Sequence, residues 1–125
     1  MDTLTLIHNN SCSKSQCLHK FLTDNHIPFL LRDYLQHPLS ASELKKLIEK
    51  IAGPAMTIVR QTEPAYKAWV AARGHEFLAD TNSVIDMLVR HPQILQRPIL
   101  IFYDRAVVGR PFEAAQFFLQ DNGLI

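Results

Sequence analysis

The sequence predicts an α/β fold, because strand-like segments at both ends of the chain flank a long helical middle. Three observations carry this prediction. The first 32 residues alternate strand, loop, helix and strand, the middle has helix caps and helical periodicity, and the last quarter returns to short strands and one helix. We therefore expect one domain over residues 1–125, with a small mixed four-stranded sheet, flanking helices and a helical insertion between strands two and three.

The N-terminal segment is typical of a strand–helix–strand unit. Residues 3–7 alternate polar and apolar side chains, and residues 8–11 form a polar loop. A helix is predicted over 13–25 and a second strand over 27–32, which gives a right-handed parallel unit. The side chains expected on the buried face of the helix are Cys17, Leu18, Phe21 and Leu22.

The middle of the chain predicts three helices. Residues 40–43 have the Ser-x-x-Glu pattern of a capping box, and the helix that follows ends at Gly53-Pro54. Two more helices are expected over 64–73 and 82–90. The third should turn Val84, Ile85, Leu88 and Val89 inward.

The last quarter predicts two strands and a helix. Residues 99–103 are a continuous apolar run, and 106–108 form a short return strand after a turn. Pro111 is placed to start the final helix at the position where proline is favoured. Its core face is Phe112, Ala115, Phe118 and Leu119. This order of elements is similar to that of a thioredoxin-like fold with helices inserted in the middle.

The composition excludes several function classes. A formal charge of +1 argues against recruitment of nucleic acid, and no apolar run approaches the ~18 residues of a membrane helix. The first seven residues carry an acid at Asp2 and no basic segment, unlike a secretory signal. Two cysteines and scattered histidines predict neither a disulfide scaffold nor a metal site. We expect a cytoplasmic monomer without a bound cofactor or membrane association.

Cys12 lies between the first predicted strand and its helix. Unpaired N–H groups and the positive end of the helix dipole meet there, and both favour a thiolate over a thiol. The hydroxyl groups of Ser13 and Ser15 can donate to the same place. A buried apolar filler is the alternative for Cys12, but its polar neighbours argue against it. For Cys17, which is on the predicted apolar stripe, a buried structural thiol is favoured.

Residues 8–16 resemble the active-site loop of the glutaredoxin-coupled arsenate reductases, whose motif is H-N-P-x-C-[GS]-x-S-R. The matching positions are His8, Asn9, Cys12, Ser13 and Ser15. The similarity continues through Tyr34-Leu35, Ser42-Glu43-Leu44, Leu47-Ile48, Arg60, Glu63-Pro64, His91-Pro92, Gln96-Arg97-Pro98-Ile99 and Gly109-Arg110-Pro111. Two positions depart from the motif, with Asn10 in place of proline and Gln16 in place of arginine.

The resemblance implies an oxyanion site lined by Arg60, Arg97 and Arg110. From composition alone, each of these arginines is better explained as a solvated surface residue. A planar guanidinium nevertheless suits an oxyanion because it pairs with two oxygens at once. The fold also implies a cis bond at Pro98 beside the thiol. His8 either stabilises a thiolate when charged or only holds the loop, and both alternatives stay open.

The resemblance implies reduction of arsenate to arsenite through a covalent adduct on Cys12, with glutathione as co-substrate and glutaredoxin as partner. One alternative is a thiol reductase of the same family with another substrate, which Gln16 favours. A second alternative is a redox-sensing transcription regulator like the Spx-type proteins. Those proteins use a C-x-x-C switch, and this chain has Ser15 where the second cysteine would be.

Overall fold

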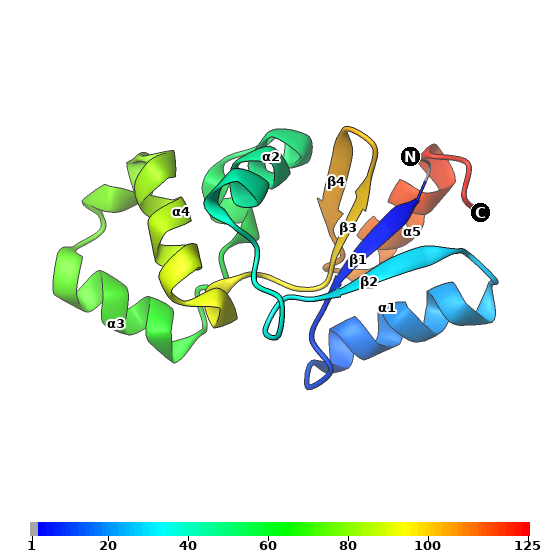
Figure 1. Cartoon of the computed structure of the whole chain (residues 1–125), viewed down its shortest axis with the longest axis horizontal. Coiled ribbons are helices and arrows are strands. Elements are labelled where there is room, and N and C mark those ends of the chain that lie inside the picture. The colour runs from blue at the N-terminus through cyan, green and yellow to red at the C-terminus, as the bar shows by residue number, and fades with distance from the viewer. Residues whose placement is uncertain (1–2) are drawn as a thin grey trace.

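The computed structural model describes residues 3–125, so Met1 and Asp2, on which the expectation about a signal segment partly rests, lie outside the described residues. Four strands form one sheet in the order β2-β1-β3-β4 (Figure 1). The strands are β1 (Leu4–His8), β2 (Phe29–Asp33), β3 (Ile99–Phe102) and β4 (Arg105–Val108). β1 and β2 are parallel, whereas β3 is antiparallel to both β1 and β4. The sheet is therefore mixed, as predicted.

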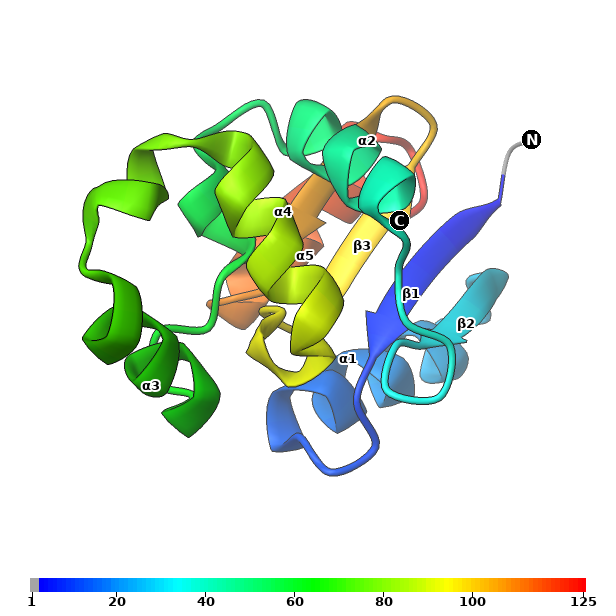
Figure 2. The same ribbon diagram turned by 60° about the vertical axis from the view of Figure 1, so that its left-hand side comes forward.

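Two layers of helices enclose the sheet (Figures 1 and 2). The helices are α1 (Ser13–Asp24), α2 (Ala41–Ile51), α3 (Pro64–Arg73), α4 (Thr81–Arg90) and α5 (Phe112–Asp121), with short 3₁₀ helices η1 (Ala55–Ile58), η2 (Glu76–Ala79) and η3 (Pro92–Ile94). On one face Leu6 of β1 packs with Leu18 of α1 and Leu119 of α5. On the other face Ile7 and Ile99 pack with the inserted helices. The alternation of side chains along β1 thus serves two separate cores.

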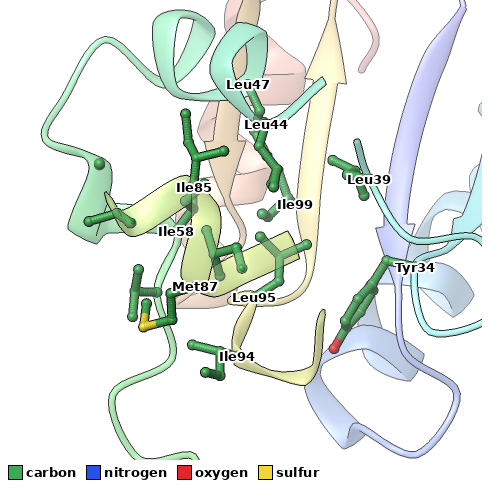
Figure 3. Packing of buried hydrophobic residues seen from close by; sticks show 14 of the residues in the cluster. Tyr34, Leu39, Leu44, Leu47, Ile58, Ile85, Met87, Ile94, Leu95 and Ile99 are labelled. Atoms are coloured by element: carbon green, nitrogen blue, oxygen red, sulfur yellow. The ribbon is translucent and has the colours of Figure 1, made fainter. Parts of the chain in front are cut away.

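The larger core lies between the sheet and the insertion (Figure 3). It is built from Leu44 and Leu47 of α2, Met87 of α4, and residues that flank the strands. Within α4, Val84, Ile85, Met87 and Leu88 are buried, but Val89 is 42% exposed. The prediction that Val89 points inward was therefore wrong. Met87 takes its place because the face that meets α2 and the sheet is centred on 84, 87 and 88.

Arg32 of β2 joins the start of the insertion to the sheet. The predicted capping box is present: the Ser40 hydroxyl accepts from the N–H of Glu43 at 3.1 Å, and the Glu43 carboxylate accepts from the N–H of Ser40 at 3.0 Å. Arg32 donates to both oxygens of the same carboxylate and to the carbonyls of His37 and Pro38. The guanidinium of Arg32 and the N–H of Ser40 lower the pKa of Glu43 to about 2.

For most helices and strands, the observed ends differ from the predicted ends by one or two residues. β2 begins at Phe29 rather than at residue 27, because the N–H of Ile27 is bonded to the Leu22 carbonyl and still closes the end of α1. α5 begins at Phe112, and Pro111 is the residue before it, in an extended conformation. The prediction that Pro111 is the first helical residue was therefore off by one position. Among residues 3–125, no helix is long and apolar enough to cross a membrane.

Candidate active site

Cys12 is the residue that caps the N-terminus of α1. Its backbone is extended, with φ −101° and ψ 121°, and its N–H donates to the Asn9 carbonyl at 3.0 Å. Its carbonyl accepts from the N–H of Gln16 at 3.0 Å, which closes the first turn of the helix. The side chain of Cys12 makes no capping hydrogen bond to the helix, and it is partly exposed. The loop therefore holds a thiol at the helix start, where N–H groups converge.

The pKa of the Cys12 thiol is lowered from 9.0 to about 7. Partial burial is the largest single influence and raises this pKa, because it disfavours the thiolate. The N–H groups of Ser15 and Lys14, the hydroxyl of Ser15 and the side chain of Arg97 together outweigh it. Ser15 is fully buried, and its hydroxyl has no other partner among residues 3–125. Near neutral pH a large fraction of Cys12 is therefore thiolate.

Arg110 contacts the sulfur directly. One of its terminal nitrogens, Nη2, lies 3.3 Å from Cys12 Sγ, and its Nε donates to the Arg97 carbonyl at 2.7 Å. This second hydrogen bond fixes the direction of the guanidinium. The peptide bonds Arg97–Pro98 and Arg110–Pro111 are both cis. The hydrogen bond from Arg110 to the Arg97 carbonyl joins these two segments of backbone beside the thiol.

Arg97 is held by the backbone that precedes β3. Its Nη1 donates to the carbonyls of Gln93 at 2.9 Å and Leu95 at 3.3 Å. Its Nε is buried and has no hydrogen-bond partner within the described part of the chain. A buried N–H of this kind is costly unless it is satisfied. Arg97 thus keeps one unsatisfied, buried donor, and its side chain also helps to lower the pKa of Cys12.

Arg60 lies at a cavity that Arg110 also lines. The cavity has a volume of about 450 Å³, and its walls are Val59, Arg60, Gln61, Thr62, Gln96 and Arg110. The Nε of Arg60 is buried without a hydrogen bond, and the nearest carboxylate oxygen, from Glu63, is 3.8 Å away. Arg110 therefore joins the other two arginines, because it donates to the Arg97 carbonyl and lines the same cavity as Arg60.

Gly109 allows the β4 end of the hairpin to approach the proline. Its N–H donates to the Pro98 carbonyl at 2.8 Å. A Cβ at position 109 would lie 3.2 Å from Pro98 Cγ and 3.3 Å from Leu18 Cδ2, closer than ordinary contact. Pro98 is buried beneath the site, whereas Ser13, the first residue of α1, is exposed. Glycine at 109 thus lets Arg110 reach the start of α1.

His8 is buried and bonded within the loop. Its Nε2 lies 2.7 Å from the amide oxygen of Asn10, which can only accept, so Nε2 carries the proton. Its Nδ1 is buried without a partner among residues 3–125. Burial lowers the pKa of His8. Of the two alternatives, these contacts favour a neutral histidine that holds the loop.

The two positions that depart from the family motif meet in the same loop. The side-chain amide of Gln16 donates to the Asn10 carbonyl, and the side chain of Asn10 accepts from His8. Gln16 is therefore directed to the backbone of the loop, and it supplies no positive charge to the thiol. The pair holds the loop by hydrogen bonds, in place of the restricted backbone of a proline.

Asn9 and Tyr34, to which sequence analysis gave no role, are buried and support the loop through hydrogen bonds. The Asn9 amide donates to the Tyr34 hydroxyl at 3.1 Å and accepts from the N–H of Ser11 at 2.9 Å. Figure 3 shows Tyr34 at the border of the large core. Burial raises the pKa of its phenol, on which the charges of Arg97, Cys12 and Arg60 also act. The only sequence signal was that Asn9 matches the loop motif and that Tyr34 lies in a further stretch of family similarity.

Cys17 is exposed, so the prediction of a buried structural thiol was wrong. The buried face of α1 consists of Ser15, Leu18 and Leu22. These positions have the spacing i, i+3 and i+7 of a helix stripe, and Ser15 begins the stripe because it lies beneath the thiol. Cys17 is two positions further along and points away from this face. Within residues 3–125 no group of three or more His, Cys, Asp or Glu side chains could hold a metal ion.

Known proteins that are similar to this chain include arsenate reductases and a transcriptional regulator. The chain is 30% identical over 114 residues to an arsenate reductase of Neisseria meningitidis serogroup A, covering 90% of this chain and 95% of that protein. It is 26% identical over 117 residues to the global transcriptional regulator Spx 2 of Lactococcus lactis, covering 93% and 86%. The fold matches a solved arsenate reductase from Vibrio cholerae with a TM-score of 0.81 at 24% identity, covering 91% of this chain and 96% of that one. The ArsC family profile matches residues 7–118, and the chain belongs to the ArsC family.

Proposed function

We propose that this protein reduces arsenate to arsenite through a covalent adduct on Cys12, with glutathione and glutaredoxin as the source of electrons. The observation that carries the proposal is the contact at 3.3 Å between Arg110 Nη2 and Cys12 Sγ, on a thiol whose pKa is about 7. A thiolate nucleophile and a guanidinium beside it are what attack on an oxyanion requires. Family membership and the arsenate reductase from Neisseria meningitidis support the substrate.

In the first step, the Cys12 thiolate attacks arsenic and forms a sulfur–arsenic bond. An arsenate oxygen takes up a proton and leaves as water. Arg97 and Arg110 hold the remaining oxygens, and their positive charges offset the negative charge that develops in the transition state. Arg97 is close enough to act on this sulfur, since its side chain helps to lower the pKa of Cys12.

In the second step, the thiol of glutathione attacks arsenic and displaces another oxygen as water. A glutaredoxin thiol then attacks the glutathione sulfur to form a mixed disulfide, and both electrons of the broken sulfur–arsenic bond stay on arsenic. Two thiols become one disulfide, so two electrons pass to arsenic, which goes from the pentavalent to the trivalent state. Water then attacks the trivalent arsenic, the bond between Cys12 sulfur and arsenic breaks, and arsenite and the Cys12 thiolate are released. We infer that the protein acts in the cytoplasm, because glutathione and glutaredoxin keep thiols reduced there. We also propose that it is a monomer with a single domain.

The test is a coupled assay that follows NADPH oxidation in the presence of arsenate, glutathione, glutaredoxin and glutathione reductase. We expect arsenate-dependent oxidation that disappears when glutaredoxin is omitted or Cys12 is replaced by serine. No arsenate dependence at saturating glutathione and glutaredoxin would refute the proposed substrate.

Gln16 favours a second candidate, a glutathione-linked reductase of the same family that acts on another substrate. Its amide is directed to the Asn10 carbonyl, so the position adds no cation to the oxyanion site. Replacing Gln16 with arginine separates the two candidates. An enzyme that gains arsenate activity only with this substitution would favour the second candidate, whereas activity in the wild type favours the first.

The similarity to the Lactococcus lactis regulator Spx 2 supports a third candidate function, redox-sensing regulation of transcription. A regulator of that class would retain RNA polymerase from a cell extract on the immobilised protein. Retention of polymerase together with absence of turnover in the coupled assay would favour regulation over both enzyme proposals.

A further inference from the structure

The sheet face that carries the inserted helices is only partly covered by them. α2 packs against β4, and Figure 2 shows no helix in front of β1 and β2 on this side. Thr5 of β1 is in register with Leu30 of β2 and Ile101 of β3, so the three side chains form one row on this face. Thr5 and Ile101 are half-buried, and Leu30 is 54% exposed. A largely apolar strip of the sheet therefore stays open beside α2.

A cavity lies between α2 and this strip. Its volume is about 330 Å³, at the lower end of the roughly 300–1,000 Å³ of small-molecule sites. The sheet contributes Thr5, Ile7 and Ile101 to its lining, and Leu39 and Leu47 add further apolar surface. It shares no lining residue with the cavity beside the thiol. The proposed arsenate chemistry therefore gives this second cavity no role.

The helix side of the cavity is positively charged. Glu43, Lys46 and Lys50 line it from α2, and their spacing of i, i+3 and i+7 places them on one face of the helix. Both oxygens of the Glu43 carboxylate already accept from Arg32, so this carboxylate is neutralised by a different residue. Lys46 and Lys50 have no carboxylate partner among residues 3–125. Two ammonium groups thus lie beside apolar surface without an anion from the described part of the chain.

We propose that this cavity binds a small amphipathic anion, a molecule with one carboxylate and a short apolar chain. The carboxylate lies against the ammonium groups of Lys46 and Lys50, which donate to its oxygens. The apolar chain covers Thr5 and Ile101 and removes their exposed surface from water. The volume is that of a small molecule rather than of a segment of a partner protein.

The test uses octanoate as the probe, in an NMR titration of the full ¹⁵N-labelled chain. We expect saturable shifts of the amide signals of β1 and α2, with one octanoate bound per chain. Hexanoate and butanoate should bind more weakly, by roughly two- to fourfold for each methylene removed, because less apolar surface is buried. 1-Octanol, which keeps the chain but has no charge, should also bind more weakly than octanoate.

Substitutions on α2 test the position of the carboxylate. Lys46→Gln and Lys50→Gln should each raise the Kd of octanoate roughly two- to fivefold, the effect of losing one exposed ion pair. Glutamine forms helices about as well as lysine, so α2 is retained. Lys45→Gln is the matched control, because Lys45 is an exposed neighbour on the same helix that does not line the cavity. It should leave the Kd unchanged, and none of the three variants should change the Kd of 1-octanol.

Three results would overturn this assignment. The first is an equal Kd for octanoate in the Lys45, Lys46 and Lys50 variants, which would place the carboxylate elsewhere. The second is an equal affinity for butanoate and octanoate, which would remove the apolar strip from the site. The third is 1-octanol binding as tightly as octanoate, which would refute an anionic ligand. The titration needs no arsenate, so its result is independent of the proposed function.

Discussion

The two cysteines at the start of α1 are five residues apart and differ in exposure and in the groups around them. Cys12 is less exposed than Cys17, yet it is the one that faces N–H groups of the first helical turn and the guanidinium of Arg110. Cys17 is on the solvent side of the same helix, beyond the turn in which N–H groups are unpaired. The difference predicts that position relative to the helix start, rather than exposure, determines which thiol becomes a nucleophile.

The largest expected effect is loss of activity when the two cysteines are replaced separately. Cys12→Ser should reduce arsenate-dependent turnover by roughly 10³-fold or more, because a hydroxyl is far less ionised than this thiol. Cys17→Ser should keep turnover close to wild type. The coupled assay measures both, and a collapse of activity in Cys17→Ser would mean that Cys17 resolves the intermediate.

The next effect concerns the guanidinium of Arg110, which contacts Cys12. Arg110→Ala should weaken binding of arsenate or sulfate by roughly 1.5–3 kcal/mol, the range for a hydrogen bond to a charged group. Arg97→Ala should act in the same direction. Affinity is measured as protection of Cys12 from alkylation, with Arg105→Ala, an exposed arginine of β4, as the control. Equal protection in all three variants would remove both arginines from the oxyanion site.

A third prediction compares the pH dependence of the two thiols. In a Cys17→Ser background, alkylation of Cys12 should be half-maximal near pH 7, where its pKa lies. Since the folded pKa of about 7 is below the ordinary value of 9.0, the stabilisation of the fold by the thiolate is fully present above pH 9 and is lost as pH falls through 7.

Urea unfolding at several pH values checks the stability part of this prediction. The protein with Cys12 should gain stability between pH 7 and 9 relative to the Cys12→Ser variant. Parallel curves for the two proteins over this range would show that the fold does not favour the thiolate.

The smallest effects concern Cys17 itself. Because this side chain is exposed, Cys17→Ser should change the free energy of unfolding by no more than ~0.5 kcal/mol.

We also expect no routine disulfide between the two cysteines. Helix positions five apart differ by ~140° and ~7.5 Å of rise, whereas a disulfide needs Cα atoms about 4.4–6.8 Å apart. A dominant Cys12–Cys17 disulfide, detected by mass after oxidation, would contradict this.

Local signals in the sequence predicted the fold well. The order of strands and helices, the capping box at Ser40 and the loop that carries Cys12 all follow from patterns within a few residues. The burial of Cys17 was predicted wrongly, because helical periodicity alone does not identify which of two neighbouring stripes meets the sheet. Ser15, a polar residue, begins the buried stripe, and hydrophobicity could not signal it.

The parts of the site that could not be predicted depend on contacts between distant segments. The hydrogen bond from Asn9 to Tyr34 joins residues 25 positions apart, and the contact from Arg110 to Cys12 joins residues 98 apart. The cavity is formed by residues 59–62 with Gln96 and Arg110, which come together only in the folded chain. Resemblance to a family named the arginines, but only the folded chain shows that Arg110 contacts the thiol and that Arg60 and Arg110 line one cavity.

Arg32 has a consequence for solubility. β2 is an outer strand, and its free edge includes the exposed leucines Leu30 and Leu31, a surface that can pair with a strand of another molecule and start aggregation. The apolar run stops at Arg32, whose guanidinium is bonded to the following turn and to Glu43. The edge is thereby kept to five residues and followed by a fixed turn. One arginine thus both attaches the insertion to the sheet and limits self-association along its open side.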